Sequence, residues 1–164
     1  MLYRAVFGAR VSSRAAAPEQ IALDPTVRGG KETILLVEDD VAVLARVVLQ
    51  RHGYRVVEAG SGNEALSVWE EHGSPIDLLL TDMIMPDGMT GRDLAKQLLT
   101  RNPRLKVIYT SGYTADLEGM PSELRQAPTF LQKPYHPQKL ARAVRECLDL
   151  AAVKSMNETT DQHR

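Results

Sequence analysis

The central part of the chain alternates short apolar runs with segments whose apolar residues recur at helical spacing. Short β-rich runs of this kind predict strands, and here they cover residues 33–37, 54–58, 76–81, 107–110 and 129–131. Helical periodicity follows the first, second, third and fifth runs. The stretch at 113–128 is interrupted by glycine and prolines, so we expect at most short or irregular helix there.

Three of the predicted helices carry recognisable start signals. Ser61 with Glu64, and Thr90 with Asp93, have the spacing of a capping box, in which each side chain satisfies a backbone N–H of the other. Pro137 suits the first residue of the last helix, where a missing N–H costs nothing. These signals agree with the periodicity.

Repeated strand–helix units indicate a (βα)5 chain. Continuously apolar strands are typical of a parallel sheet that is buried on both faces. Right-handed crossovers then place helices on both sides of the sheet. We therefore predict an α/β fold: a doubly wound five-stranded parallel sheet with helices on both faces.

Polar residues follow four of the predicted strands. Glu38 and Asp39 come after the first, Asp82 after the third, Ser111 after the fourth and Lys133 after the fifth. The carboxyl ends of parallel strands lie along one edge of a sheet, so these side chains are expected to share one cleft. Three neighbouring carboxylates repel one another unless a cation or a proton offsets their charge. The cluster therefore predicts a binding site.

The chemistry of that cluster favours phosphoryl transfer. Carboxylate oxygens suit a hard cation such as Mg²⁺, and a carboxylate can attack phosphorus to give an acyl phosphate. Lysine supplies a compact positive charge and serine a hydroxyl donor, both suited to phosphate oxygens. A helix-capping role for Glu38 and Asp39 is the simpler alternative for those two acids.

Composition limits the number of domains and the kinds of partner, but it does not indicate a function. The 164 residues suit one domain with tails, and the net charge of −1 gives no reason to expect nucleic acid or an anionic membrane. The single cysteine, Cys147, excludes an intrachain disulfide. No apolar run approaches the roughly 20 residues of a membrane-spanning helix. We expect a soluble, cytoplasmic protein.

The two ends of the chain differ from its middle. Residues 1–30 contain arginines, prolines and a Gly-Gly pair, and are interpreted as a flexible leader or linker, with an organellar presequence as the alternative. Residues 31–150 carry the strand and helix pattern and form the predicted domain. Residues 151–164 are polar and are expected to be a disordered tail.

Four motifs in this order resemble the receiver domains of two-component response regulators, the CheY-like fold. The resemblance covers residues 32–150. Its motifs are LLVEDD at 35–40, LTDMIMP at 80–86, VIYTSG at 107–112 and FLQKP at 130–134. The loops around these motifs look most like receivers fused to hybrid sensor histidine kinases, which leaves open a stand-alone receiver or a module of a larger kinase.

The resemblance implies a phosphate acceptor and a metal site. Asp82 matches the acceptor, and Glu38 and Asp39 match the acidic pair that holds Mg²⁺, with Mn²⁺ as the alternative ion. Asp82 itself and the backbone carbonyl of Ile84 would complete the ligand set. No further cofactor is expected.

The resemblance also implies a conformational switch. Ser111 matches the hydroxyl, and Lys133 the lysine, that contact the phosphoryl group on Asp82. Phe130 stands where the family places a rotating aromatic residue. Phosphorylation would then shift the domain toward an active conformation.

The predicted function is phosphorelay signalling, and the protein is not expected to be an enzyme in the ordinary sense. It would catalyse only its own phosphorylation and dephosphorylation. The phosphodonor implied is a phosphohistidine on a sensor histidine kinase or a histidine phosphotransfer protein. Whether the protein forms a homodimer on phosphorylation is left undecided by the sequence. No direct contact with nucleic acid or membrane is expected.

Two alternatives come from other functional classes. A pseudo-receiver would use the same fold only to bind proteins. A nucleotide-binding enzyme is disfavoured because acids follow the first strand and no glycine-rich phosphate loop is present. A haloacid-dehalogenase phosphatase would require a second aspartate two residues after Asp82, where Ile84 stands.

Overall fold

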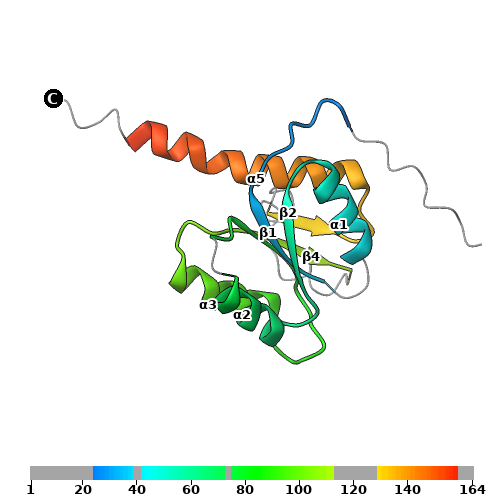
Figure 1. The fold of residues 1–164 in the computed structure, drawn as a ribbon, viewed down its shortest axis with the longest axis vertical. Helices are drawn as coiled ribbons and strands as arrows, with labels where there is room; N and C mark the ends of the chain where they lie inside the picture. Colours follow the sequence, from blue (N-terminus) through cyan, green and yellow to red (C-terminus); the bar gives the residue numbers. More distant parts are fainter. Residues whose placement is uncertain (1–23, 39–41, 73–74, 113–128, 159–164) are drawn as a thin grey trace, which may run out of the picture.

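The structure is a computed structural model that describes residues 24–38, 42–72, 75–112 and 129–158, with side chains described as far as residue 150. Within these residues the chain forms five strands and four helices, and their arrangement can be followed in Figure 1. In chain order they are β1 (Thr33–Val37), α1 (Ala42–Arg51), β2 (Arg55–Ala59), α2 (Gly62–Glu71), β3 (Leu78–Asp82), α3 (Gly91–Arg101), β4 (Lys106–Ser111), β5 (Phe130–Gln132) and α5 (Pro137–Glu158).

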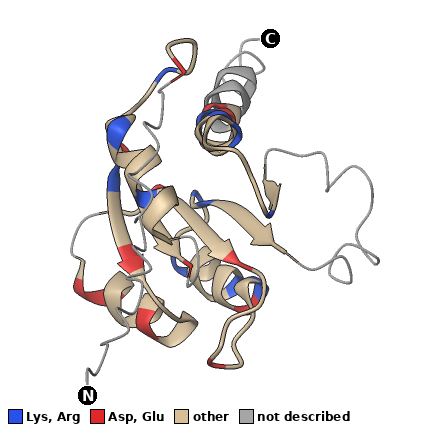
Figure 2. Ribbon diagram, turned by 90° about the vertical axis from the view of Figure 1, so that its right-hand side faces the viewer, with Lys and Arg blue, Asp and Glu red and all other residues tan. Residues whose placement is uncertain are grey.

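The five strands form one parallel sheet in the order β2-β1-β3-β4-β5. This confirms the predicted α/β fold. The register decides where the site forms: Val37 pairs with Thr81, so the next residues, Glu38 and Asp82, emerge side by side. β2 and β3 each carry an acidic residue near the carboxyl end (Figure 2).

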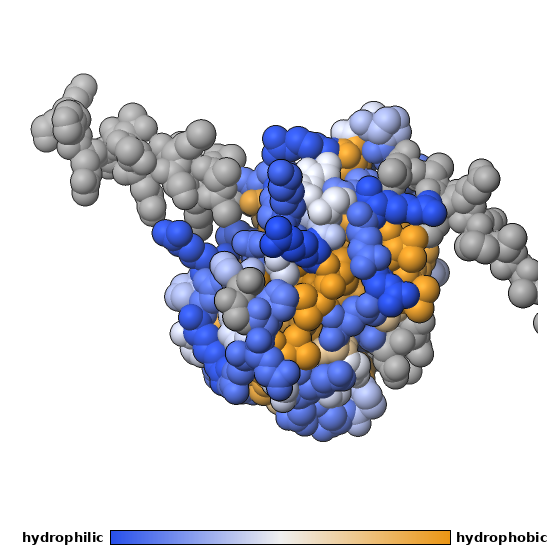
Figure 3. Space-filling model, in the orientation of Figure 1, coloured by the Kyte–Doolittle hydropathy of each residue, from blue (hydrophilic) through white to orange (hydrophobic). Residues whose placement is uncertain are grey.

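Helices cover both faces of the sheet, as the crossovers predict. α1 and α5 lie on one face, and α2 and α3 on the other (Figure 1). Successive residues of β1 alternate between the two cores: Ile34 and Leu36 face α1 and α5, whereas Leu35 and Val37 face α2 and α3. Figure 3 shows apolar residues at the surface near the middle of one view, where Figure 1 places the edge strand β2.

The helix starts follow the sequence signals with one difference. Thr90 and Asp93 form the full capping box of α3, and α5 begins at Pro137. At α2 the Ser61 hydroxyl accepts from the N–H of Glu64, as expected. The Glu64 carboxylate, however, accepts from the N–H of Gly60 instead of Ser61, at 2.7 Å.

Element boundaries shift by one or two residues from those predicted, and α5 continues to Glu158. The helix therefore extends into the segment, from residue 151, that the sequence predicts as a tail. The irregular stretch 113–128 lies outside the described residues. None of the described helices combines the length and apolar character that crossing a membrane requires.

The segment before β1 lies against the domain from Asp24 onward. Asp24 pairs with Arg142 of α5 at 3.3 Å, and Arg28 pairs with Asp149 at 3.4 Å. Val27 packs against the core between α1 and α5. Residues 1–23 lie outside the described part of the chain, and the domain boundaries stay predictions.

Candidate functional site

One lysine joins two carboxylates at the carboxyl edge of the sheet. The Lys133 ammonium lies 2.7 Å from Glu38 Oε1 and 2.8 Å from Asp82 Oδ2. Glu38 follows β1, Asp82 ends β3, and Lys133 follows β5, so three strand ends converge here. The structure thus brings these three side chains together, while their chemical roles stay predictions.

Glu38 is the buried member of the pair. Its side chain is only 2% exposed, and burying a carboxylate is unfavourable unless its oxygens are hydrogen-bonded. Lys133 takes one oxygen, and the Thr110 hydroxyl donates to the other at 3.2 Å. With both oxygens engaged, Glu38 is held in a single orientation.

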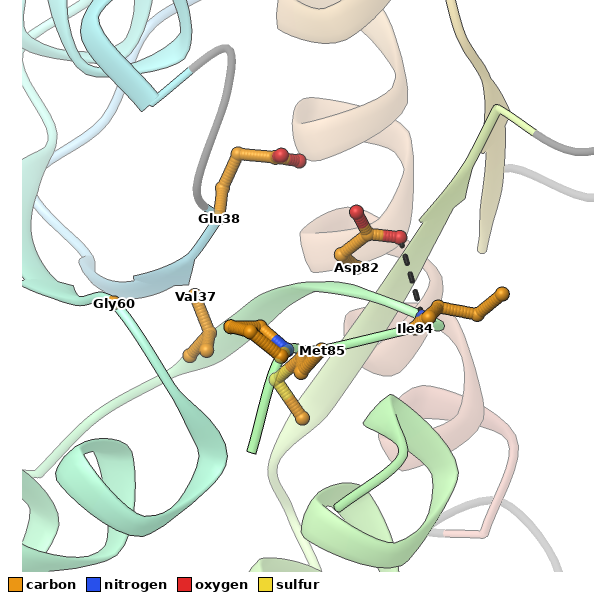
Figure 4. Close-up of a pocket in the computed structure, with 7 residues that line it drawn as sticks. Val37, Glu38, Gly60, Asp82, Ile84 and Met85 are labelled. Carbon is orange, nitrogen blue, oxygen red and sulfur yellow. Dashed lines mark hydrogen bonds between the residues drawn. The ribbon is translucent and has the colours of Figure 1, made fainter. Parts of the chain in front are cut away.

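Asp82 is the more accessible carboxylate. Its side chain is 23% exposed, and within the described residues its second oxygen, Oδ1, accepts only a long contact of 3.4 Å from the N–H of Ile84. Figure 4 shows Asp82 and Glu38 directed toward the same space, with that contact dashed. Asp82 therefore has an oxygen available to a reactant or a ligand.

A small hollow opens beside Asp82 (Figure 4). Ile84 lies at this hollow and is 52% exposed. Gly60, from the loop between β2 and α2, forms part of the wall and was not identified from the sequence. The hollow is lined by Val37, Glu38, Gly60, Asp82, Ile84, Met85 and Pro86.

The charge of Lys133 is stabilised by its position. Burial by itself would lower the pKa of the ammonium, but hydrogen bonds to Asp82 and Glu38 and their negative charges outweigh it. The pKa of Lys133 is therefore raised above its usual value. The lysine remains a cation throughout the neutral range.

Ser111 and Phe130 lie next to this cluster. Ser111 ends β4, is 1% exposed, and its carbonyl accepts from the N–H of Lys133 at 2.8 Å. Phe130 begins β5 and forms a small buried cluster with Met83, the residue after Asp82, and with Tyr109. Of the two residues predicted as switch elements, Ser111 thus contacts Lys133, and Phe130 packs on the residue after Asp82.

One predicted ligand lies outside the described residues, and one contact of the site was not predicted from the sequence. Asp39 lies outside the described residues, so its predicted role as a metal ligand stays a prediction. Thr110 was missed by the sequence analysis, although a threonine in an otherwise apolar buried strand was a usable signal. Its hydroxyl is one of the two groups that hold the buried Glu38.

The donor set fits a hard divalent cation. Glu38 and Asp82 supply carboxylate oxygens at a hollow that the Ile84 segment also lines, and oxygen ligands are those that Mg²⁺ prefers. Two carboxylates face one ammonium, so negative charge remains for a cation to offset. Among the described residues no three acidic, histidine or cysteine side chains form a cluster, and Asp39 is not among them.

Comparison with known proteins identifies the family. The family model of the response regulator receiver domain matches residues 34–145. The sensor kinase CckA of Brucella abortus is 39% identical over 138 residues, which is 82% of this chain but 14% of CckA. The response regulator receiver protein CpdR of the same organism is 32% identical over 117 residues, covering 70% of this chain and 95% of CpdR.

Solved structures give the same result. The receiver domain of the hybrid histidine kinase CckA is 37% identical with a TM-score of 0.57, covering 71% of this chain and 98% of that domain. A receiver domain protein from Clostridium thermocellum is 27% identical with a TM-score of 0.60, covering 74% and 98%. The motifs, the sheet order and these matches agree, and the chain belongs to the family of response regulator receiver domains.

Proposed function

We propose that this receiver accepts a phosphoryl group on Asp82 from a phosphohistidine of a two-component partner. The observation that carries the proposal is the partly exposed Asp82 carboxylate, held by Lys133 at 2.8 Å beside an open hollow. An Asp82 oxygen attacks phosphorus, the phosphorus–nitrogen bond breaks, and the histidine ring leaves with the bonding electron pair and takes up a proton. The product is an acyl phosphate.

A divalent cation is part of this proposal. Glu38, Asp39, Asp82 and the carbonyl of Ile84 would hold Mg²⁺ or Mn²⁺. When bound, the ion offsets negative charge on the transferring phosphoryl group. The protein's own contribution is to hold the Asp82 carboxylate in place and to supply the Lys133 charge next to it.

Lys133 and Ser111 are proposed to hold the phosphoryl group after transfer. A phosphorylated aspartate carries more negative charge than the free carboxylate and adds acceptor oxygens. The ammonium already lies beside Asp82, and Ser111 has a hydroxyl one strand away. New contacts of these groups would favour a second conformation, with Phe130 next to Met83 as the aromatic element that responds.

The relatives support a kinase or a phosphotransfer protein as the partner. One relative is a sensor kinase, CckA, and another is a receiver protein, CpdR. Because this chain spans 14% of CckA, the activities of a whole kinase are not transferred to it. The cytoplasmic location, the absence of nucleic-acid contacts and a dimer on phosphorylation stay predictions.

The decisive experiment is intact mass spectrometry after incubation with acetyl phosphate, with and without Mg²⁺. We expect a metal-dependent gain of one phosphoryl group in the wild type and none in Asp82→Asn. The alternative is a pseudo-receiver that only binds proteins. A folded wild type that gains no mass and binds no Mg²⁺ would establish that alternative.

A further inference from the structure

The acceptor loop, residues 83–90 between β3 and α3, is held firmly at its base. The N–H of Met83 donates to the carbonyl of Thr110 on β4, and the N–H of Gly91 donates to the carbonyl of Met83, both at 2.9 Å. Ile84 and Thr90 pair across the loop as an antiparallel bridge. The two ends of the loop are therefore fixed to the sheet and to each other.

The tip of the acceptor loop is attached to a different element. Asp87 Oδ2 accepts a hydrogen bond of 3.0 Å from the backbone N–H of Asn63, in the first turn of α2. First-turn N–H groups have no partner inside their helix, and the positive end of the helix dipole favours a carboxylate. Asp87 thus caps a helix to which it does not belong.

A second contact joins the same two segments. A Cβ added to Gly62, the first residue of α2, would lie 2.6 Å from Met89 Sδ and 3.1 Å from Met85 Cε. Gly62 is buried, so the methionines of the acceptor loop pack directly on its backbone. The start of α2 and the acceptor loop therefore meet through one polar and one apolar contact.

These two segments form walls of the hollow beside Asp82. Gly60, just before α2, lines one part, and Ile84, Met85 and Pro86 of the acceptor loop line another (Figure 4). Asp87 immediately follows Pro86 in the loop. Its hydrogen bond to Asn63 therefore fixes the distance between the acceptor-loop wall and the Gly60 wall of the hollow.

We propose that Asp87 is a positioning residue of the phosphoacceptor site: by capping α2 it holds the acceptor loop so that Ile84 and Asp82 face the cation and the phosphoryl group correctly. Asp87 is not among the residues that line the hollow. The inference rests on the proposed function, because it concerns the binding geometry of that site. It adds a residue outside the acidic, hydroxyl and lysine set that the sequence identified.

Ser61 provides a matched control. It caps the same helix, accepting from the N–H of Glu64 at 3.2 Å, but belongs to the segment before α2 and does not hold the acceptor loop. Asp87→Ala and Ser61→Ala each remove one cap from α2 and are expected to lower the melting temperature by similar amounts. Only Asp87→Ala also releases the acceptor loop.

The test measures Mg²⁺ affinity by titration calorimetry and phosphoryl uptake from acetyl phosphate by intact mass. We expect Asp87→Ala to weaken Mg²⁺ binding by about threefold to tenfold, the size of one lost surface cap, and to slow uptake by a similar factor. Ser61→Ala should stay within about twofold of the wild type, since it leaves the loop attached. Asp87→Asn keeps an acceptor oxygen and should recover most of the loss.

Hydrogen exchange separates a failure of this inference from a failure of the proposed function. Releasing the loop should speed exchange of the backbone amides of residues 84, 85, 87 and 88 in Asp87→Ala but not in Ser61→Ala. Unchanged exchange there, or equal Mg²⁺ affinities in the two alanine variants, would overturn the role of Asp87. A wild type that neither binds Mg²⁺ nor gains mass refutes the proposed function, and with it this role for Asp87.

Discussion

The two ends of β1 carry similar charge clusters with different surroundings. At the carboxyl end, Lys133 binds both Glu38 and Asp82. At the amino end, the Arg145 guanidinium binds Glu32 at 3.1 Å and an aspartate of its own helix, α5, at 2.8 Å. Each end thus has one cation shared by two carboxylates, and the cluster at the carboxyl end borders the hollow beside Asp82.

At the amino end the backbone packs closely on the cluster. Arg145 is 12% exposed, and its other terminal nitrogen donates to the Tyr54 hydroxyl at 3.4 Å. The backbone of Gly30 lies directly over this network: a Cβ there would overlap Glu32 Oε2 and lie 2.8 Å from Arg145 Nη1. An added side chain at this position would have to displace Glu32 or Arg145. The two carboxylates themselves stay partly exposed, Glu32 to 29% and Asp149 to 47%.

The difference shows how one charge pattern serves two purposes. Guanidinium is a planar fork that suits fixed, paired hydrogen bonds, whereas the lysine ammonium is a point charge on a flexible stem. Burial by itself would lower the pKa of Arg145, but hydrogen bonds to Asp149 and Glu32 raise it above its usual value. Arginine anchors the amino end, and lysine leaves the carboxyl end able to exchange partners.

The largest expected effect separates the two cations by function. Lys133→Ala should slow phosphoryl uptake from acetyl phosphate about 100-fold, because it removes the positive charge beside Asp82. Arg145→Ala should leave the uptake rate within about twofold, since its network lies at the other end of β1. Initial rates by intact mass measure both. Equal losses in the two variants would show that the ends are not functionally distinct.

For the free energy of unfolding we expect the reverse order: the substitution at the amino end should cost more than the one at the carboxyl end. Arg145→Ala leaves Glu32 and Asp149 without their shared cation and should lower the free energy of unfolding by about 2–4 kcal/mol. Asp82→Asn keeps the pair of Lys133 with Glu38 and removes one of two neighbouring negative charges, so it should change stability by no more than about 1 kcal/mol. Urea unfolding compares them. A larger loss in Asp82→Asn would contradict the division.

A pair of glycine substitutions tests how tightly the amino end is packed. Gly30→Ala should cost about 1–3 kcal/mol, because the added methyl must displace Glu32 or Arg145. Gly112 lies at the carboxyl end, and its nearest neighbour for an added methyl is Lys133 Cβ at 3.8 Å, so Gly112→Ala should stay within about 0.5 kcal/mol. Thermal unfolding decides, and similar melting temperatures for both would refute the packing argument.

Acid should weaken the amino end through Glu32. Burial by itself would raise the pKa of this carboxyl, but backbone hydrogen bonds and Arg145 outweigh it and lower the pKa below its usual 4.5. The stabilisation is therefore complete above the unfolded value and is lost as pH falls through the lower folded value. Urea unfolding at about pH 6 and in acid below the usual value should show a smaller loss for Glu32→Gln than for the wild type. An equal loss would exclude this contribution.

The smallest expected change in stability comes from removing the hydroxyl of either of two buried tyrosines. Tyr54→Phe removes the hydroxyl that accepts from Arg145 and should cost about 0.5–1.5 kcal/mol. Within the described residues the Tyr135 hydroxyl is buried and has no hydrogen-bond partner, so Tyr135→Phe should leave stability unchanged or raise it. Melting temperatures of the two variants give the comparison. A clear loss in Tyr135→Phe would mean that a water or another group satisfies this hydroxyl.

Sequence patterns alone were enough to predict the fold and the edge on which the site lies. Apolar runs, helical periodicity and capping residues are local signals, and they located the described strands and helices to within a few residues. Parallel pairing then brings the carboxyl ends together, which is why the order of the strands along the chain was enough to group Glu38, Asp82 and Lys133. Their roles in phosphorylation stay predictions for the experiments above.

Tertiary structure alone decided how those residues are used. Which carboxylate is buried and which is open depends on strand register and on partners far along the chain, such as Thr110 for Glu38, 72 residues apart. The cluster at the amino end of β1 joins Arg145 to Glu32, which are 113 residues apart. Asp87 caps α2, a helix that precedes it in the sequence. Local patterns carry no record of such contacts, because side-chain hydrogen bonds form only after distant segments have packed against one another.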